Sequence, residues 1–204
     1  MIAIIDYGVG NLFSLTSSLS YLGLENEVTD SAEALRQADA IILPGVGAFG
    51  DATKKLRATG LVETILSEAH AGKPLLGICL GMQLLFERSF EYGEHEGLAL
   101  LPGEIAPLAA DISLKVPHIG WNSLQFTPGC PLLKYNTPGD YVYYVHSFYL
   151  KNSPVVVATS DYGVAVPGVA ACGNVYGCQF HPEKSGAAGL QILRAFGELK
   201  GANA

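Results

Sequence analysis

The chain lacks a surplus of positive charge. Its 204 residues carry 12 Lys and Arg against 19 Asp and Glu, which gives a formal net charge of -7. Proteins that bind nucleic acid neutralise phosphates with clustered basic side chains, and no basic stripe runs along this sequence. We therefore expect no nucleic-acid partner.

Long apolar runs and an N-terminal targeting pattern are missing as well. No apolar stretch approaches the ~20 residues that a membrane-spanning helix needs, and the opening MIAIIDYG has neither the basic region nor the cleavage pattern of a signal peptide. We expect a cytoplasmic protein that makes no contact with a membrane. Its 49% hydrophobic and 15% charged residues exclude a disordered chain and suit one domain over residues 1–204.

The cysteines form no metal-binding pattern. Cys79, Cys130, Cys172 and Cys178 include no CxxC pair, and no histidine stands at metal-ligand spacing from them. The sequence therefore indicates neither a zinc site nor a disulfide framework, and we expect no metal and no cofactor. Because Cys172 and Cys178 alternate with apolar residues, we predict that both lie in the core.

Strand and helix patterns alternate through the first half of the chain. Short apolar runs predict strands at residues 2–5, 40–43 and 75–78, and a shorter, polar-flanked strand is predicted around residues 27–29. Apolar residues at helical spacing predict helices at about 12–22, from 31 through 35, and at 61–69. This rhythm predicts an α/β fold, a three-layer sandwich in which helices cover both faces of a mostly parallel sheet.

Turn signals dominate the second half. Pro-Gly pairs separate shorter strands, which we predict at 141–150, 155–159 and 175–180 as antiparallel additions to the sheet. A last helix is predicted from about Ala187 to Lys200, with Ser185 as its cap.

The most specific pattern is GICLG at residues 77–81, where the apolar period changes from strand to helix. A G-x-C-x-G sequence at such a junction has the pattern of a nucleophile elbow, with Cys79 on a strained turn between two glycines. The start of the helix favours a thiolate at Cys79 and offers the N–H of Leu80 to a developing oxyanion. The alternative is a buried cysteine that only fills the core.

A cysteine nucleophile needs an imidazole base and an acidic group that orients it. His181 ends the strand predicted at 175–180, and Pro182 biases it toward an extended conformation, so that His181 and Glu183 can face one pocket. Taken alone, this segment equally fits a strand-to-helix turn with Glu183 in the first helical turn.

A second glycine-rich turn, Pro44-Gly45-Val46-Gly47, directly follows the strand at 40–43. It lacks the Lys and Ser/Thr of a phosphate-binding P-loop and the spacing of a dinucleotide fingerprint. Because it follows a strand beside the one that ends at Cys79, we predict that its free N–H groups form an oxyanion hole.

Three segments, GICLGMQLLFE, PGVGAFG and HPEKS, resemble the triad class of glutamine amidotransferases. Within that class, the opening IAIIDYGVGNLFSL, VPHIGWN at 116–122, YVYYVHSFY at 141–149 and HPEKSG resemble the glutaminase subunits of imidazole glycerol phosphate synthase. The likeness extends over nearly the whole chain. It implies hydrolysis of L-glutamine through a cysteine thioester and delivery of ammonia to a partner, a (β/α)8-barrel cyclase subunit that completes a heterodimer. The cyclase forms imidazole glycerol phosphate and an aminoimidazole carboxamide ribotide in histidine biosynthesis.

The resemblance also implies four groups of site residues. The catalytic residues are Cys79 as nucleophile, His181 as base and Glu183 as the orienter of His181. The oxyanion hole is implied at Val46, Gly47 and Leu80. The glutamine-binding residues are Gln83, His146, Ser147 and Phe148. The residues implied to face the partner are Trp121, Tyr143 and Lys184, for which core packing of the two aromatic side chains and a solvated charge are the alternatives.

Two other functions fit the same motifs. One is a glutaminase of the same class that serves pyridoxal phosphate, tetrahydrofolate-pathway or tryptophan synthesis. The other is a catalytically silent module that only binds a partner, against which the complete set of Cys79, His181 and Glu183 argues.

Overall fold

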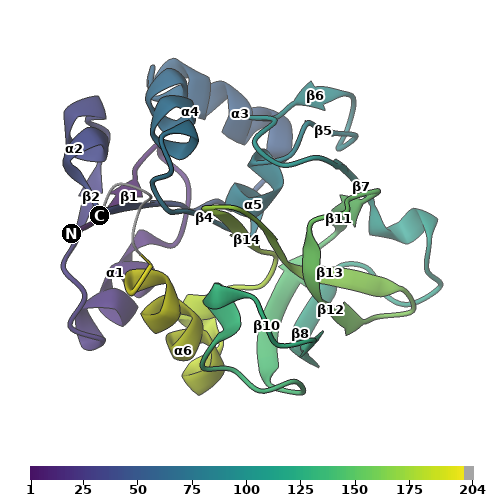
Figure 1. Cartoon of the computed structure of the whole chain (residues 1–204). Helices are drawn as coiled ribbons and strands as arrows, with labels where there is room; N and C mark the ends of the chain where they lie inside the picture. Colours follow the sequence, from purple (N-terminus) through teal and green to yellow (C-terminus); the bar gives the residue numbers. More distant parts are fainter. Residues whose placement is uncertain (200–204) are drawn as a thin grey trace.

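The computed structural model describes residues 1–199, and an eight-stranded sheet of order β2-β1-β3-β4-β14-β13-β12-β9 runs through it (Figure 1). Five neighbouring strands are parallel: β2 (Asn26–Thr29), β1 (Ile2–Ile5), β3 (Ala40–Leu43), β4 (Leu75–Ile78) and β14 (Val175–Cys178). The remaining three are antiparallel: β13 (Ala165–Cys172), β12 (Val156–Asp161) and β9 (Gln125–Phe126).

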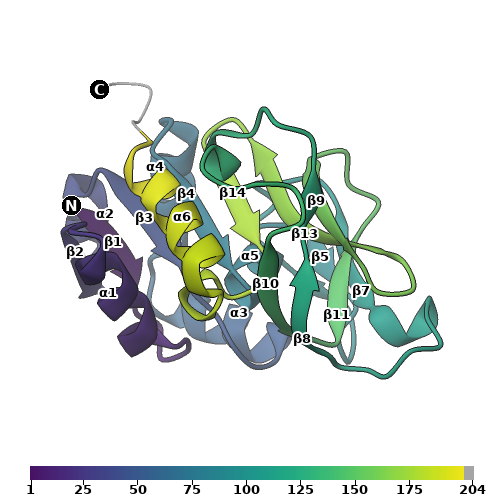
Figure 2. The ribbon, with the colours of Figure 1, turned by 90° about the horizontal axis from the view of Figure 1, so that it is seen from below.

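Helices cover both faces of the parallel part. One face carries α2 (Ala32–Gln37), α3 (Phe49–Ala58) and α4 (Val62–His70), and the other carries α1 (Leu12–Tyr21) and α6 (Gly186–Gly197) (Figures 1 and 2). Alternate strand residues serve the two layers: Ile41 packs with the first helix group and Ile42 with the second. The predicted three-layer α/β sandwich is therefore confirmed. None of the helices in residues 1–199 has the length and apolar character needed to cross a bilayer.

Two smaller sheets stand beside the antiparallel end. One pairs β10 (Tyr141–His146) with β8 (His118–Ser123), and the other has the order β11 (Phe148–Lys151), β7 (Glu104–Pro107), β5 (Arg88–Ser89), β6 (His95–Glu96). Short helical turns complete the chain: α5 (Leu80–Leu84), η1 (Leu108–Ala110), η2 (Pro131–Leu133) and η3 (Pro182–Lys184). The single strand predicted at 141–150 was wrong, because the chain breaks at Ser147 and its two halves pair in different sheets.

Four further predictions need correction. The strand at 175–180 ends at Cys178 and lies parallel to β4, although it is antiparallel to β13. In addition, the sequence did not predict α3. The hydroxyl of Ser185 does not cap α6: it donates to the carbonyl of His181, and α6 ends at Gly197; Lys200, its predicted end, lies outside the described residues. Cys172 is exposed at the end of β13, whereas Cys178 is buried as predicted.

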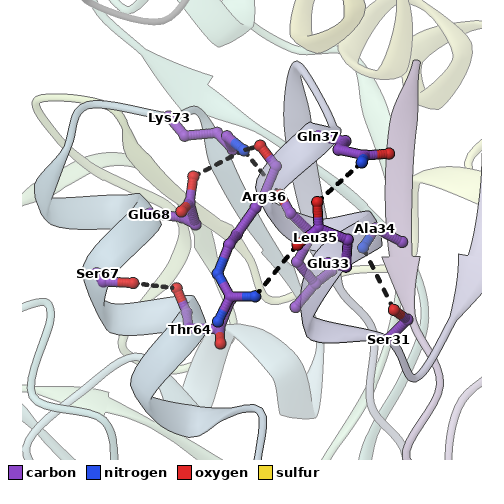
Figure 3. A network of polar contacts seen from close by, with 10 residues as sticks. All are labelled: Ser31, Glu33, Ala34, Leu35, Arg36, Gln37, Thr64, Ser67, Glu68 and Lys73. Atoms are coloured by element: carbon purple, nitrogen blue, oxygen red, sulfur yellow. Dashed lines mark hydrogen bonds and ion pairs between the residues drawn. The ribbon is translucent and has the colours of Figure 1, made fainter.

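Lys73, just before β4, ties α2 to α4 (Figure 3). Its ammonium donates to the carbonyls of Leu35 and Arg36, 2.7 Å from each, and pairs with Glu68 at 2.7 Å. These carbonyls belong to the last turn of α2, where no intrahelical N–H reaches them. At the other end of α2 the Ser31 hydroxyl accepts from the Ala34 N–H, as the sequence predicts for a cap. Both ends of this short helix are therefore held by side chains.

Candidate active site

Cys79 lies on the turn between β4 and α5, as predicted. Its backbone has φ 55° and ψ −112°, a conformation that is strained for any residue other than glycine. The glycines on either side are required by space: a Cβ on Gly81 would lie 1.8 Å from the Leu43 carbonyl oxygen, and one on Gly77 would lie 2.6 Å from that of Gly81. Main-chain contact between the N–H of Cys79 and the Cys178 carbonyl, at 2.7 Å, fixes the turn against β14. The geometry is that of a nucleophile elbow.

His181 and Glu183 form a buried pair beside this turn. Nδ1 of His181 lies 2.8 Å from Oε1 of Glu183, and both side chains are only 3% exposed. Because the carboxylate accepts a hydrogen bond from Nδ1, Nε2 is the nitrogen left to interact with Cys79. Burial lowers the pKa of His181, but the hydrogen bonds with Cys79 and Glu183 outweigh it and raise this pKa to about 9. The site therefore favours an imidazolium next to the sulfur.

Gln179 is a residue of this site that the sequence analysis missed. It is fully buried, and its amide nitrogen lies 4.0 Å from the Cys79 sulfur. Its carbonyl oxygen accepts from the Gln83 amide at 3.0 Å, so the amide N–H groups of Gln179 are turned toward Cys79. Such a donor supports negative charge on sulfur. The signal was available, because Gln179 stands two residues before His181 and alternate residues of an extended chain share a face.

The turn from Pro44 to Gly47 packs against the start of α5. The hydroxyl of the buried Tyr7 donates to the Pro44 carbonyl at 2.7 Å, and a Cβ on Gly45 would lie 2.7 Å from the Gly81 nitrogen. Gly47 has φ +97°, a conformation that side chains rarely adopt. This close approach brings the predicted oxyanion turn next to the elbow.

A pocket of about 410 Å³ opens over Cys79. Ten of its lining residues were predicted to be site residues: Val46, Gly47, Cys79, Leu80, Gln83, His146, Ser147, Phe148, His181 and Lys184. Glu183 lies behind His181 and does not line the pocket. Trp121 and Tyr143 are likewise absent from the lining; they stand opposite each other on β8 and β10, with ring centroids 6.0 Å apart, and Trp121 is 54% exposed. The alternative interpretation of Trp121, as a residue packed in the core, is therefore wrong.

The pocket has four lining residues that the sequence analysis did not predict: Glu91, Tyr92, Pro117 and Val145. Glu91 is 9% exposed and its Oε2 accepts from the N–H of Phe49 at 2.6 Å. Burial raises the pKa of this carboxyl, while the Phe49 bond opposes the rise. Glu91 belongs to the short hairpin between β5 and β6, where no motif in the sequence points to it.

Gln83 lies in the pocket wall, with its amide directed into the protein. Its Nε2 donates to the Phe148 carbonyl and to Oε1 of Gln179, both at 3.0 Å. These two bonds use both amide protons, so Gln83 shapes the wall more than it offers donors to a ligand. No group of three His, Cys, Asp or Glu side chains in residues 1–199 is arranged to hold a metal ion.

The fold is shared with known proteins. A solved structure described as a glutamine amidotransferase superposes with a TM-score of 0.75 at 19% identity and covers 97% of this chain and 100% of its own. The PurLQS structure from Thermotoga maritima gives 0.73 at 22% identity, with 96% of both chains covered. The model of the class-I glutamine amidotransferase family matches residues 3–198. The chain belongs to this family and is an enzyme.

Curated relatives narrow the family further. The chain is 50% identical over 201 residues to the "Imidazole glycerol phosphate synthase subunit HisH" of Listeria monocytogenes, with 98% of this chain and 96% of the relative covered. The protein of the same description from Caldanaerobacter subterraneus is 49% identical, with 98% of each covered. That from Bacillus cereus is 52% identical over 197 residues, with 96% and 93% covered. Among the amidotransferases, the chain thus groups with the glutaminase subunits of histidine biosynthesis.

Proposed function

We propose that this chain hydrolyses L-glutamine at Cys79 and supplies the ammonia to a cyclase subunit of imidazole glycerol phosphate synthase. The observation that carries the proposal is Cys79 on a strained elbow that lines the pocket together with His181, whose Nδ1 is bound to Glu183. Nucleophile, base and orienter in this arrangement are the parts that acyl transfer needs.

The reaction follows from these positions. The Cys79 thiolate attacks the carboxamide carbon of glutamine, and the N–H groups of Gly47 and Leu80 hold the oxyanion of the tetrahedral intermediate. His181 then gives its proton to the departing nitrogen, so that ammonia leaves and a thioester with Cys79 remains. With His181 neutral again, a water loses its proton to the imidazole and attacks the thioester, which releases glutamate.

Glu91 is the proposed partner of the substrate's α-ammonium. Its carboxylate is the acidic side chain that lines the pocket together with Cys79, and the Phe49 N–H keeps one oxygen in place. A charge pair inside a partly buried pocket orients a ligand and distinguishes glutamine from a plain amide. Ser147 and Phe148 also line the pocket, at the break between β10 and β11.

The proposed partner face is the outer side of the two-stranded sheet. Ile119, Trp121 and Tyr141 are 57%, 54% and 61% exposed there. The carbonyl of Tyr143, from the same sheet, accepts from the N–H of His181 at 3.0 Å, so this surface adjoins the catalytic pair. Exposed aromatic and aliphatic side chains gathered on one surface are typical of a protein interface.

Glutamate release by the purified chain together with the cyclase subunit of the same source tests the reaction. We expect glutamine-dependent glutamate formation and its loss after alkylation of Cys79. Trp121→Ala tests the interface: it weakens co-purification with the cyclase subunit, whereas Tyr21→Ala, at a side chain 80% exposed on α1, leaves it unchanged. Equal retention of the partner by both variants would contradict the proposed face.

A further inference from the structure

Two buried histidines beside the pocket take no part in the steps above. His118 on β8 and His146 on β10 are directly paired across the small sheet and are 2% and 6% exposed. Nδ1 of His118 lies 3.0 Å from Nε2 of His146. The His118 ring is stacked between Tyr144 and Tyr162, with centroids 4.6 and 3.9 Å away.

Neighbouring groups dictate where each imidazole carries its proton. Nδ1 of His146 lies 3.0 Å from the Phe148 carbonyl, which only accepts, so His146 is protonated at Nδ1 and its Nε2 is an acceptor. His118 must then donate from Nδ1, which leaves its own Nε2 to accept from the Asn122 amide at 3.4 Å. Asn122 is itself oriented, because its Oδ1 accepts from the Ser123 N–H and its Nδ2 donates to the Asp161 carbonyl. Every hydrogen bond therefore runs one way, from Asn122 to Phe148.

These hydrogen-bond directions require both imidazoles to be neutral, and burial favours the neutral form of each ring. It lowers the pKa of His118 to about 4, and burial followed by the nearby His118 lowers that of His146 to about 3. At neutral pH each ring therefore carries one N–H proton, and the series of hydrogen bonds from Asn122 to Phe148 requires one proton on each ring.

This series of hydrogen bonds ends at Phe148, on the wall of the glutamine pocket. The Phe148 carbonyl accepts from both His146 and Gln83, which fills its two lone pairs. Ser147 and Phe148 line the pocket where the chain passes from β10, which pairs with β8, to β11, which pairs with β7. His146 thus supports this break from one side, and His118 decides which of its nitrogens carries the proton.

We propose that His118 is a positioning residue of the glutamine site: its donation to His146 keeps the Nδ1 proton of His146 on the Phe148 carbonyl and so fixes the wall formed by Ser147 and Phe148. The inference rests on the proposed glutaminase function. It also links strand β8, which presents Trp121 and Asn122, to substrate binding through a named set of hydrogen bonds.

Two substitutions separate donation from packing. His118→Phe keeps a ring between Tyr144 and Tyr162 but has no donor for His146. His118→Asn loses the stacked ring but places an amide N–H at nearly the position of Nδ1. A structural role predicts that the aromatic replacement is the better tolerated, and the positioning role predicts the opposite order.

Covalent labelling of Cys79 in the whole chain with two probes measures the effect. A chloromethyl ketone shaped like glutamine needs the pocket wall, whereas iodoacetamide needs only a reactive sulfur. We expect His118→Phe to slow labelling by the ketone roughly tenfold or more, the scale of one buried group left without its partner. Labelling by iodoacetamide stays within about twofold of wild type, and His118→Asn recovers most of the ketone rate. In the complex with the cyclase subunit, we expect His118→Phe to raise KM for glutamine more than it lowers kcat.

The outcomes are decisive in both directions. A wild-type ketone rate in His118→Phe, or an equal loss in both variants, would overturn the inference. Nitrogen-detected NMR of the imidazoles in the wild-type chain gives a test without substitution: Nδ1 protonation of both rings supports it, and Nε2 protonation of either overturns it. A wild-type chain in which iodoacetamide alkylates Cys79 but the ketone does not would contradict the glutaminase function itself, and the inference with it.

Discussion

His181 donates from Nδ1 to a Glu183 carboxylate that is as deeply buried as the imidazole itself, with 2.8 Å between the two atoms. Glu183→Gln keeps the shape of this pair but removes its negative charge, so the imidazolium form of His181 is stabilised less. We expect the fold to survive and glutamine turnover to fall by roughly 10²-fold or more. Steady-state glutaminase kinetics at saturating glutamine check this. Full turnover by Glu183→Gln would mean that Glu183 has only a structural role at the start of η3.

Cys79→Ala separates ammonia production from its use. The variant removes the atom that forms the thioester, and the cyclisation chemistry is assigned to another subunit. We expect glutamine-dependent synthesis by the complex to disappear while synthesis from added ammonium salt continues at close to the wild-type rate. Loss of both activities in a correctly assembled complex is the contradicting result.

Partner binding is expected to activate the site through the turn from Pro44 to Gly47. Gly47 has φ +97°, and glycines on both sides of Val46 allow the Val46–Gly47 peptide to rotate its N–H toward or away from the oxyanion. One oxyanion donor is worth roughly 10²–10³ in turnover. The isolated chain should therefore be a poor glutaminase, the complex a better one, and the complex with cyclase ligand the best, provided that the ligand favours the active state by differential binding. Equal turnover in all three would exclude the switch.

The ionisation of His181 makes stability depend on pH. Its pKa in the folded protein is about 9, against ~6.5 for an ordinary histidine. Below pH ~6.5 the folded and unfolded states both hold the proton and the stabilisation is complete; between there and pH 9 only the folded state holds it, so stability falls as pH rises. Urea unfolding at pH 6.5, 8 and 9 should show a shallower decline for His181→Gln than for wild type. Parallel declines would contradict the raised pKa.

Lys73 gives a stability prediction away from the site. Lys73→Met keeps the apolar stem but leaves the Leu35 and Arg36 carbonyls and the Glu68 carboxylate without their shared donor. We expect a loss of about 1–3 kcal/mol in the free energy of unfolding. Lys54→Met, at an exposed residue of α3, is the matched control and should change stability by less than about 0.5 kcal/mol. Glutaminase turnover should be unaffected in both variants.

The sequence predicted best where local pattern and tertiary structure agree. The parallel strands β1, β3 and β4 follow from buried apolar runs, and the elbow at Cys79 follows from two glycines at a change of period. Residues 141–150 were misassigned because YVYYVHSFYL contains no turn signal: Ser147 marks a change of pairing partner, which depends on β7 and β8 far away in the chain. Glu91 escaped prediction for a similar reason, since only the folded hairpin brings its carboxylate to the pocket.

The pairing of β14 with β4 sets the chain's tolerance to change. Cys178 is in register with Ile78, so Cys79 follows the end of one strand and His181 extends from the end of its neighbour. The main-chain hydrogen bonds between these strands therefore fix the distance between the Cys79 sulfur and the His181 imidazole. Core side chains in the strands can vary without changing this distance. A single inserted residue before Cys79 or His181 is another matter: it turns the following side chain to the opposite face of the sheet. In sequence drift or in laboratory evolution, these two strand ends should accept many substitutions of core side chains, though not of Gly77, and no change of length.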